Sequence, residues 1–290
     1  MNKQTKHVRK PDWLKIHLGN NEHFSATGQI ISSQKLHTIC QSGRCPNQGE
    51  CWNQRSATFM IAGDICTRAC KFCNTKSGKP LPLDPDEPRR VASSIRDLDL
   101  KHIVLTSVDR DDLPDLGAGH WAQCIQEIKQ TIPGITMEVL IPDFQGRTEC
   151  LDQIISSQPE IVSHNLETVE RLTPAVRSVA RYHQSLEVLS YLSSAGVSVK
   201  SGLMLGLGET EEEVIQSMQD LLNAGCFLLS IGQYLQPSKK NIPVKEYVTP
   251  EKFEYYREKA IQLGFKYVES GPLVRSSYNS VKFLRFCYET

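Results

Sequence analysis

The segment TFMIAGDICTRACKFCNT, residues 58–75, decides the fold, because an apolar run ends in a loop that carries three cysteines. Residues 58–62 have the aromatic and β-branched composition of a buried strand. Cys66, Cys70 and Cys73, here called the loop triplet, follow with C-x3-C-x2-C spacing. Barrel active sites lie at the carboxyl ends of their strands. We therefore expect this loop to carry the chemistry.

Beyond this loop, strand patterns and helical patterns alternate along the chain. We predict strands at residues 58–62, 102–107, 137–141, 161–164, 197–205 and 227–235, with a weaker one near 267–269. We predict helices at residues 88–98, 120–131, 147–157, 183–195, 211–224 and 250–263. The alternation favours parallel strands with right-handed crossovers, in a barrel or an open doubly wound sheet. No strand precedes a G-x-G-x-x-G segment, so the dinucleotide-binding form of the open sheet loses support.

The composition is that of an ordinary globular protein, with 39% hydrophobic and 23% charged residues. The 33 basic side chains balance 33 acidic ones, so no long-range field attracts nucleic acid or an anionic membrane. No apolar stretch approaches the ~20 residues that span a bilayer. The first residues also lack the apolar segment of a secretory signal. We expect a cytoplasmic protein without nucleic-acid or membrane partners.

The loop triplet has the spacing of an iron–sulfur site. Three thiolates on one short loop can bind three irons of a cubane cluster and leave the fourth iron open to a small molecule. Structural zinc is the first alternative, but a closed zinc site takes four ligands, usually as two C-x2-4-C pairs. A disulfide would need an oxidising compartment, for which the sequence carries no signal. We therefore expect the loop triplet to be catalytic.

A second group of cysteines, here called the N-terminal triplet, consists of Cys40, Cys45 and Cys51 with C-x4-C-x5-C spacing. Taken alone, it fits zinc, an iron–sulfur cluster or three unrelated thiols. Its position just before the loop triplet favours a second cluster. The weak periodicity around it predicts loops in place of helix or strand. The four remaining cysteines are scattered and are expected to be small buried hydrophobic residues.

The loop triplet, the aromatic Phe72 before its last cysteine and the βα alternation resemble the radical S-adenosylmethionine superfamily. The two triplets, in this order, are similar to the cluster pattern of the lipoyl synthase family. Further segments that resemble this family are RKPDWLK, VLTSVDRDDLPDLGAGHWA, VLIPDFQG, HNLETVERL, KSGLMLGLGE, GQYLQPSKKNIPVKEYVTPEKF and GPLVRSSY. They run from Arg9 to Tyr278 and so cover nearly the whole chain.

The resemblance implies that two sulfur atoms are inserted at carbons 6 and 8 of an octanoyl chain held on a carrier lysine. It implies two 4Fe-4S clusters, one that cleaves S-adenosylmethionine to a deoxyadenosyl radical and one that donates sulfur. The implied carriers are 2-oxoacid dehydrogenase E2 subunits and the glycine cleavage H protein. Ferredoxin or flavodoxin would supply electrons, and an iron–sulfur carrier would rebuild the spent cluster. The alternatives are another two-cluster radical enzyme that inserts sulfur or methylthio groups, and a non-enzymatic iron–sulfur or zinc module.

The resemblance also implies a serine of the RSSY motif, residues 275–278, as the fourth ligand of the second cluster. We expect Ser277, with Ser276 as the alternative. An oxygen ligand binds iron more weakly than thiolate does, so this corner of the cluster could open. Without the resemblance, two serines after a strand would be interpreted as a turn.

Polar residues at strand ends are the expected cofactor contacts. Thr106 and Ser107 end one strand before an acidic loop, for which a solvated loop with internal ion pairs is the alternative. Asn165 and Glu167 follow another strand. Lys200 lies within an apolar strand, where a charge is costly unless it meets an anion. We expect it to bind the cofactor's carboxylate, with an interior ion pair as the alternative.

The expected fold is α/β and has three parts. Residues 1–55 form a cysteine-rich N-terminal extension that carries ligands of the second cluster. Residues 56–270 form a partial parallel (β/α)6 barrel of the TIM type. Residues 271–290 form a C-terminal tail whose RSSY motif closes the second cluster.

Overall fold

The computed structural model describes residues 9–15, 22–54 and 56–287. Eight strands form one sheet in the order β1-β2-β5-β6-β7-β8-β9-β10, which is the order of the chain. Strands β2 and β5 to β10 pair in parallel, whereas β1 pairs antiparallel with β2. A doubly wound sheet would reverse its strand order, so this sequential order is that of a barrel. Within the described residues β1 and β10 do not pair with each other, and the barrel is partial.

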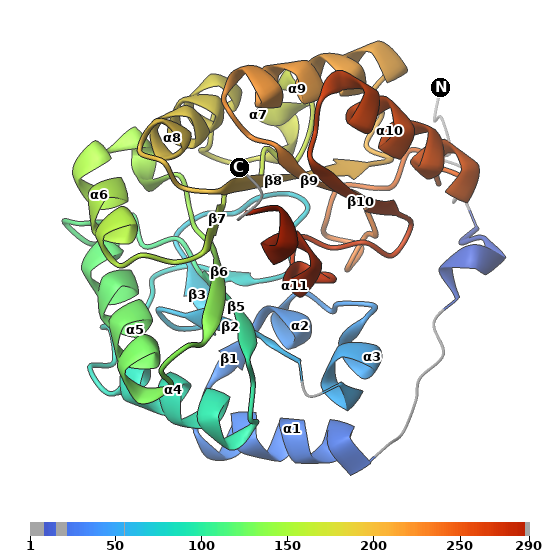
Figure 1. The fold of residues 1–290 in the computed structure, drawn as a ribbon. Helices are drawn as coiled ribbons and strands as arrows, with labels where there is room; N and C mark the ends of the chain where they lie inside the picture. Colours follow the sequence, from blue (N-terminus) through green and yellow to red (C-terminus); the bar gives the residue numbers. More distant parts are fainter. Residues whose placement is uncertain (1–8, 16–21, 55, 288–290) are drawn as a thin grey trace.

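The elements of the barrel lie close to their predicted ranges. The parallel strands are β2 (Thr58–Ile61), β5 (His102–Ser107), β6 (Thr136–Leu140), β7 (Ile161–Ser163), β8 (Val199–Leu205), β9 (Leu228–Gln233) and β10 (Tyr267–Gly271). The long helices are α4 (Glu87–Asp97), α5 (Ala118–Thr131), α6 (Thr148–Ser156), α8 (Tyr182–Ser194), α9 (Glu211–Asn223) and α10 (Pro250–Leu263). They lie around the outside of the sheet (Figure 1). The weaker predicted strand is present as β10, which adds a seventh parallel strand to the six expected.

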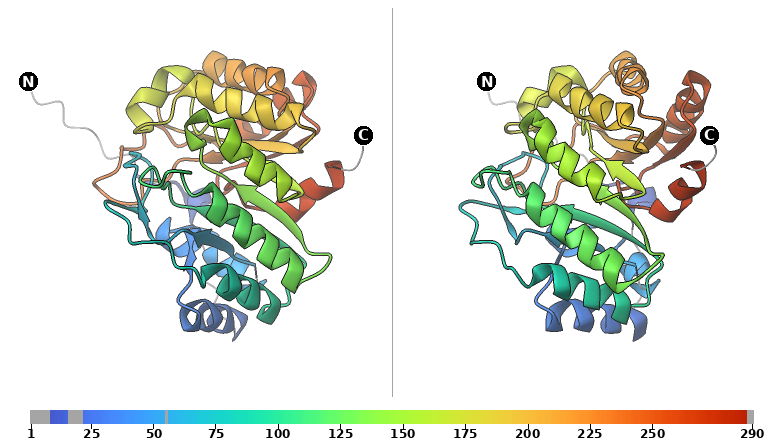
Figure 2. Two further views of the ribbon diagram at one scale, coloured as in Figure 1. Left: turned by 90° about the vertical axis from the view of Figure 1, so that its left-hand side faces the viewer. Right: turned by 60° about the vertical axis from the view of Figure 1, so that its left-hand side comes forward.

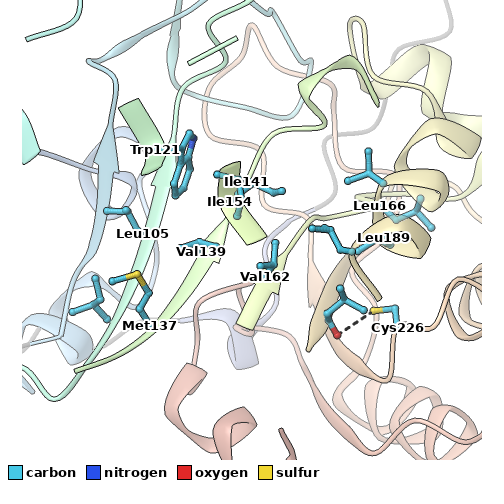
Figure 3. Close-up of a cluster of buried hydrophobic side chains, with 14 of the residues drawn as sticks. Leu105, Trp121, Met137, Val139, Ile141, Ile154, Val162, Leu166, Leu189 and Cys226 are labelled. Carbon is cyan, nitrogen blue, oxygen red and sulfur yellow. Dashed lines mark hydrogen bonds between the residues drawn. The ribbon is translucent and has the colours of Figure 1, made fainter. Parts of the chain in front are cut away.

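The main core lies between the sheet and this ring of helices (Figure 3). Successive strands contribute Leu105, Val139 and Val162, and the covering helices contribute Trp121, Ile154 and Leu189. All six side chains are buried. Each buried side chain of this size contributes roughly 1.5–3 kcal/mol. None of the described helices has both the length and the apolarity needed to cross a bilayer.

The N-terminal extension is more regular than the loops predicted for it, and that prediction was wrong. It contains α1 (Glu22–Ser33), β1 (His37–Thr38), α2 (Ile39–Ser42) and α3 (Gln48–Asn53). The rings of Phe24 and Trp52 lie 5.1 Å apart and join α1 to α3, and Thr27 donates a hydrogen bond to the carbonyl of Trp52. Short helices gain their stability from tertiary packing, so these leave little periodicity in the sequence.

The C-terminal tail runs back through the inside of the barrel. It passes so close to β9 that a Cβ on Gly232 would lie 2.1 Å from the carbonyl oxygen of Val274. It continues into α11 (Ser280–Phe283), where Phe283 packs on Ile161 and Leu228, at the beginnings of β7 and β9. Figures 1 and 2 show α11 inside the ring of helices, at the end of the barrel away from the loop after β2. The tail therefore fills the amino-terminal mouth of the barrel.

Candidate functional site

A cavity of about 530 Å³ lies at the carboxyl ends of the strands. Most of the predicted site residues line it: Cys40, Cys45, Cys66, Cys70, Cys73, Thr106, Ser107, Asn165, Glu167, Ser276 and Ser277. Cys51 and Lys200 are the two predicted residues that do not. Residues of both cysteine triplets and of the RSSY motif therefore meet at one cavity, although they come from three separate parts of the chain.

The loop triplet is held in a form that suits thiolate ligands. The sulfur of Cys66 accepts backbone N–H groups of Arg68 at 3.4 Å and Asp109 at 3.3 Å, and that of Cys73 accepts the N–H of Thr75 at 3.4 Å. Burial, with the nearby Asp109 carboxylate, raises the pKa of Cys66 to about 12, and burial raises the pKa of Cys73. The thiols of Cys66 and Cys73 therefore stay protonated until a cation offsets the cost of charging them, and N–H donors are already in place for the two resulting anions.

The N-terminal triplet forms a second group of this kind. The N–H of Cys45 donates to the carbonyl of Cys40 at 2.9 Å. Burial raises the pKa of Cys51 to about 12, and the nearness of Cys40 and Cys45 adds to the rise. The buried indole nitrogen of Trp52 has no hydrogen-bond partner among the described residues, and it lies close enough to Cys40 to oppose the rise in pKa that burial causes there. A cluster-bound thiolate at Cys40 would provide the acceptor that this indole lacks.

A cluster and a single metal ion require different arrangements of the thiolates in the two triplets. In the described parts of the chain, no three His, Cys, Asp or Glu side chains are gathered in a way that would hold one ion. The thiolates of a cluster bind separate irons, whereas those of a zinc site converge on one atom.

The RSSY segment lies beside the N-terminal triplet. The side-chain amide of Asn47 donates to the carbonyl of Leu273 at 2.7 Å, and the hydroxyl of Tyr278 donates to Glu50 at 3.4 Å. Asn47 and Glu50 both lie between Cys45 and Cys51. These contacts join residues more than two hundred positions apart, so no local sequence pattern could have predicted them.

The two serines of the motif differ in their surroundings. The amide nitrogen of Asn165 donates to the hydroxyl oxygen of Ser276 at 2.6 Å and to the carboxylate of Glu167 at 3.1 Å. The Ser277 side chain has no hydrogen-bond partner within the residues that the structure describes. Glu167 is held at a φ of 71° with its carboxyl group at the cavity, where burial raises its pKa.

Sequence reasoning missed a charged cluster beside the loop triplet. Arg68, whose side chain is 4% exposed, donates two hydrogen bonds to Asp111, both at 2.8 Å, and two to Asp143 at 2.8 and 3.0 Å. Burial alone would lower the pKa of Arg68, but the bonds to these carboxylates outweigh burial and raise it. The acidic loop after β5 thus folds onto Arg68, which corresponds to the internal ion pairs held as the alternative. The available signal was an arginine inside the cysteine loop.

For Lys200, which we expected to bind the cofactor's carboxylate, the structure shows the interior ion pair that was the alternative. Its ammonium group lies 2.9 Å from both carboxylate oxygens of Glu138, and the two side chains are 1% and 0% exposed. Lys200 therefore already has an anionic partner inside the barrel, and it is not itself among the residues that line the cavity. Thr106 and Ser107 do reach the cavity, but Thr106 donates to the carbonyl of Leu140 at 3.0 Å.

Comparison with known proteins identifies the family. Residues 60–221 match the Radical SAM superfamily. A lipoyl synthase of Parabacteroides distasonis is 63% identical over 278 residues, which make up 96% of this chain and 99% of the relative. The chain belongs to the lipoyl synthase family. This membership confirms the predicted enzyme class, a radical SAM sulfurtransferase, and the predicted cofactor classes, S-adenosylmethionine and 4Fe-4S clusters.

Solved structures agree on the fold. Streptococcus suis SuiB bound to the precursor peptide SuiA matches with a TM-score of 0.59 at 13% identity, over 73% of this chain and 48% of SuiB. The hydrogenase maturase HydG of Carboxydothermus hydrogenoformans matches with a TM-score of 0.56 at 14% identity, over 90% of this chain and 78% of HydG. The chain thus spans about half the length of SuiB. At such identities these structures bear on the fold alone, and they agree with the partial parallel barrel predicted for this chain.

Proposed function

We propose that this chain converts a protein-bound octanoyl-lysine to lipoyl-lysine by inserting two sulfur atoms. The loop triplet would hold the cluster that binds S-adenosylmethionine, and the N-terminal triplet with Ser277 would hold the sulfur-donating cluster. When bound, these groups supply the radical that removes hydrogen from unactivated carbons and the sulfur that replaces it. The observation that carries the proposal is the single cavity lined by residues of both triplets and both serines.

The choice of Ser277 as ligand rests on its surroundings. The hydroxyl oxygen of Ser276 accepts from Asn165, and its carbonyl accepts from Lys200 at 2.5 Å. Ser277 lines the same cavity with a hydroxyl group that has no partner in the described part of the chain. A hydroxyl oxygen holds iron less tightly than thiolate does, which suits a corner that must open when sulfur leaves.

Asn165, Glu167, Thr106 and Ser107 are proposed to bind the cofactor, because all four line the cavity at strand ends. The position of the Asn165 side chain depends on Gly202, where a Cβ would lie 2.8 Å from the amide oxygen of Asn165. The described side chains here offer both a neutral amide and hydroxyl groups. Such groups can hold a zwitterionic ligand without adding a second net charge.

The division at residues 1–55, 56–270 and 271–290 is proposed as a division of roles, in which the extension and the tail ligate one cluster and the barrel the other. The enzyme acts on octanoylated carrier proteins. We propose the 2-oxoacid dehydrogenase E2 subunits and the glycine cleavage H protein as these carriers. We also propose ferredoxin or flavodoxin as the electron donor, an iron–sulfur carrier for cluster repair, and the cytoplasm as the location.

Anaerobic reconstitution tests the proposal. The protein should bind about eight irons. Cys66→Ala should abolish deoxyadenosine release, whereas Cys40→Ala should preserve this release and block lipoyl formation on an octanoylated carrier. Cys150→Ala, a buried cysteine away from the cavity, is the matched control and should leave both activities in place. Deoxyadenosine release without any lipoyl product from the unaltered protein would favour the alternative, a different sulfur-inserting or methylthiolating enzyme.

A further inference from the structure

We propose that the ion pair between Lys200 and Glu138 is a latch that positions the RSSY segment for its cluster. Lys200 is a positioning residue in this proposal, because it acts through the backbone of Ser276 and not on the cluster itself. The inference rests on the proposed role of Ser277 as a ligand. It also replaces the cofactor-binding role that the sequence suggested for Lys200.

The first contact of the latch is with the peptide that joins the two serines. The ammonium group of Lys200 donates to the carbonyl oxygen of Ser276 at 2.5 Å while it is paired with Glu138. A peptide unit is planar, so fixing this carbonyl also fixes the nitrogen of Ser277 and restricts the position of its Cα. A hydrogen bond from a buried cation is stronger than one between neutral groups. Ser277, the proposed ligand, is therefore held in place through the backbone carbonyl of Ser276.

The second contact is with the tail beyond the motif. Glu138 accepts hydrogen bonds from the hydroxyls of Ser163, at 2.7 Å, and Ser280 at the beginning of α11. The Ser280 hydroxyl also lies 2.8 Å from Nε2 of His102, and the ring of Phe283 lies 3.9 Å from the Lys200 nitrogen. The pair therefore holds the tail both within the RSSY segment, at Ser276, and just beyond it, at Ser280.

Stability alone does not explain this pair. A buried ion pair carries a large desolvation cost, and replacing such a pair by apolar residues of similar volume is often neutral or stabilising. An apolar pair could fill the same space, but it could not donate to the Ser276 carbonyl or accept from Ser280. What the charges add in this proposal is a defined place for the tail, a kind of conformational specificity that buried polar groups provide in some proteins.

The test is the double variant Lys200→Met with Glu138→Gln, in reconstituted enzyme kept anaerobic. Glutamine keeps hydrogen-bonding groups for the two serines, and methionine cannot donate to the Ser276 carbonyl. The protection of backbone amides at residues 272–287 against hydrogen exchange should fall roughly tenfold. A chelator should remove iron from the serine-ligated cluster faster by a similar factor. Deoxyadenosine release should continue, because the loop triplet is untouched.

The matched control is Tyr182→Phe, which removes a buried hydroxyl from Ser217 and Asp220 away from the tail. Tail exchange in the double variant equal to that in this control would overturn the latch. If the double variant does not fold, Ser280→Ala removes the hydroxyl that donates to Glu138 and should still speed amide exchange at residues 272–287. Unchanged exchange in Ser280→Ala would also overturn the proposed latch. Lipoyl formation by Cys40→Ala would instead refute the proposed function, while tail exchange would still decide the latch.

Discussion

Replacing Arg68 by methionine should destabilise the cluster-free protein by about 3–5 kcal/mol. The guanidinium makes four hydrogen bonds of 2.8 to 3.0 Å to Asp111 and Asp143. The Asp143 side chain is only 1% exposed. Methionine keeps the apolar stem of the arginine but leaves this carboxylate buried without a cation. An uncompensated buried charge is what makes removal of one partner of a buried pair strongly destabilising.

Urea unfolding of reduced, cluster-free protein measures this loss, and Arg171→Met is its matched control. Arg171 also binds a carboxylate through two nitrogens, at Glu213, but its side chain is 55% exposed. Exposed pairs contribute about 0–1 kcal/mol, so the control should lose little. Adding Asp143→Asn to Arg68→Met should recover part of the loss, because it removes the unpaired buried charge.

The reasoning would be refuted if Arg68→Met cost no more than Arg171→Met at equal denaturant slope. It would equally fail if Asp143→Asn deepened the loss caused by Arg68→Met. In either case the cysteine loop would owe its shape to backbone contacts and not to the charged cluster.

Three further predictions concern single side chains. Burial lowers the pKa of His164 to about 4 from its ordinary 6.5, so between these pH values only the unfolded chain binds a proton. The free energy of unfolding should therefore fall by up to about 3 kcal/mol as pH drops from 6.5 to 4. Unfolding of His164→Gln should depend less on pH. Gly232→Ala should displace the tail at Val274, seen as faster tail amide exchange with the barrel amides unchanged. Thr210→Ala removes the hydroxyl that accepts from the N–H of Glu213 and should cost about 1 kcal/mol in thermal unfolding; a loss near zero would contradict this capping role.

Most of the barrel could be predicted because its determinants are local. Strand and helix periods are properties of neighbouring residues, and the end signals are equally short in range. The hydroxyl of Thr210 and the carboxylate of Glu213 form the capping box expected at α9. The N-terminal helices escaped prediction because α1 and α3 are stabilised by each other, through Phe24 and Trp52, and not by a clear stripe of their own.

The candidate site likewise has features that the sequence predicted and features that only the fold decided. The cysteine spacings and the family segments were enough to assign both triplets and the RSSY motif to the site. The spatial relations did not follow from them, because Asn47 meets Leu273, and Asn165 meets Ser276, only after the tail has entered the barrel.

The sequence by itself determined the order in which strands and helices follow one another. It also indicated, from spacing along the chain, which thiols are near enough to be proposed as ligands of one cluster. The tertiary structure alone decided which buried charges meet. Lys200 and Glu138 lie on β8 and β6, and Arg68 finds its partners after β5 and β6. Which buried charges pair depends on which strands become neighbours in the low-dielectric interior. A short stretch of sequence does not contain that information.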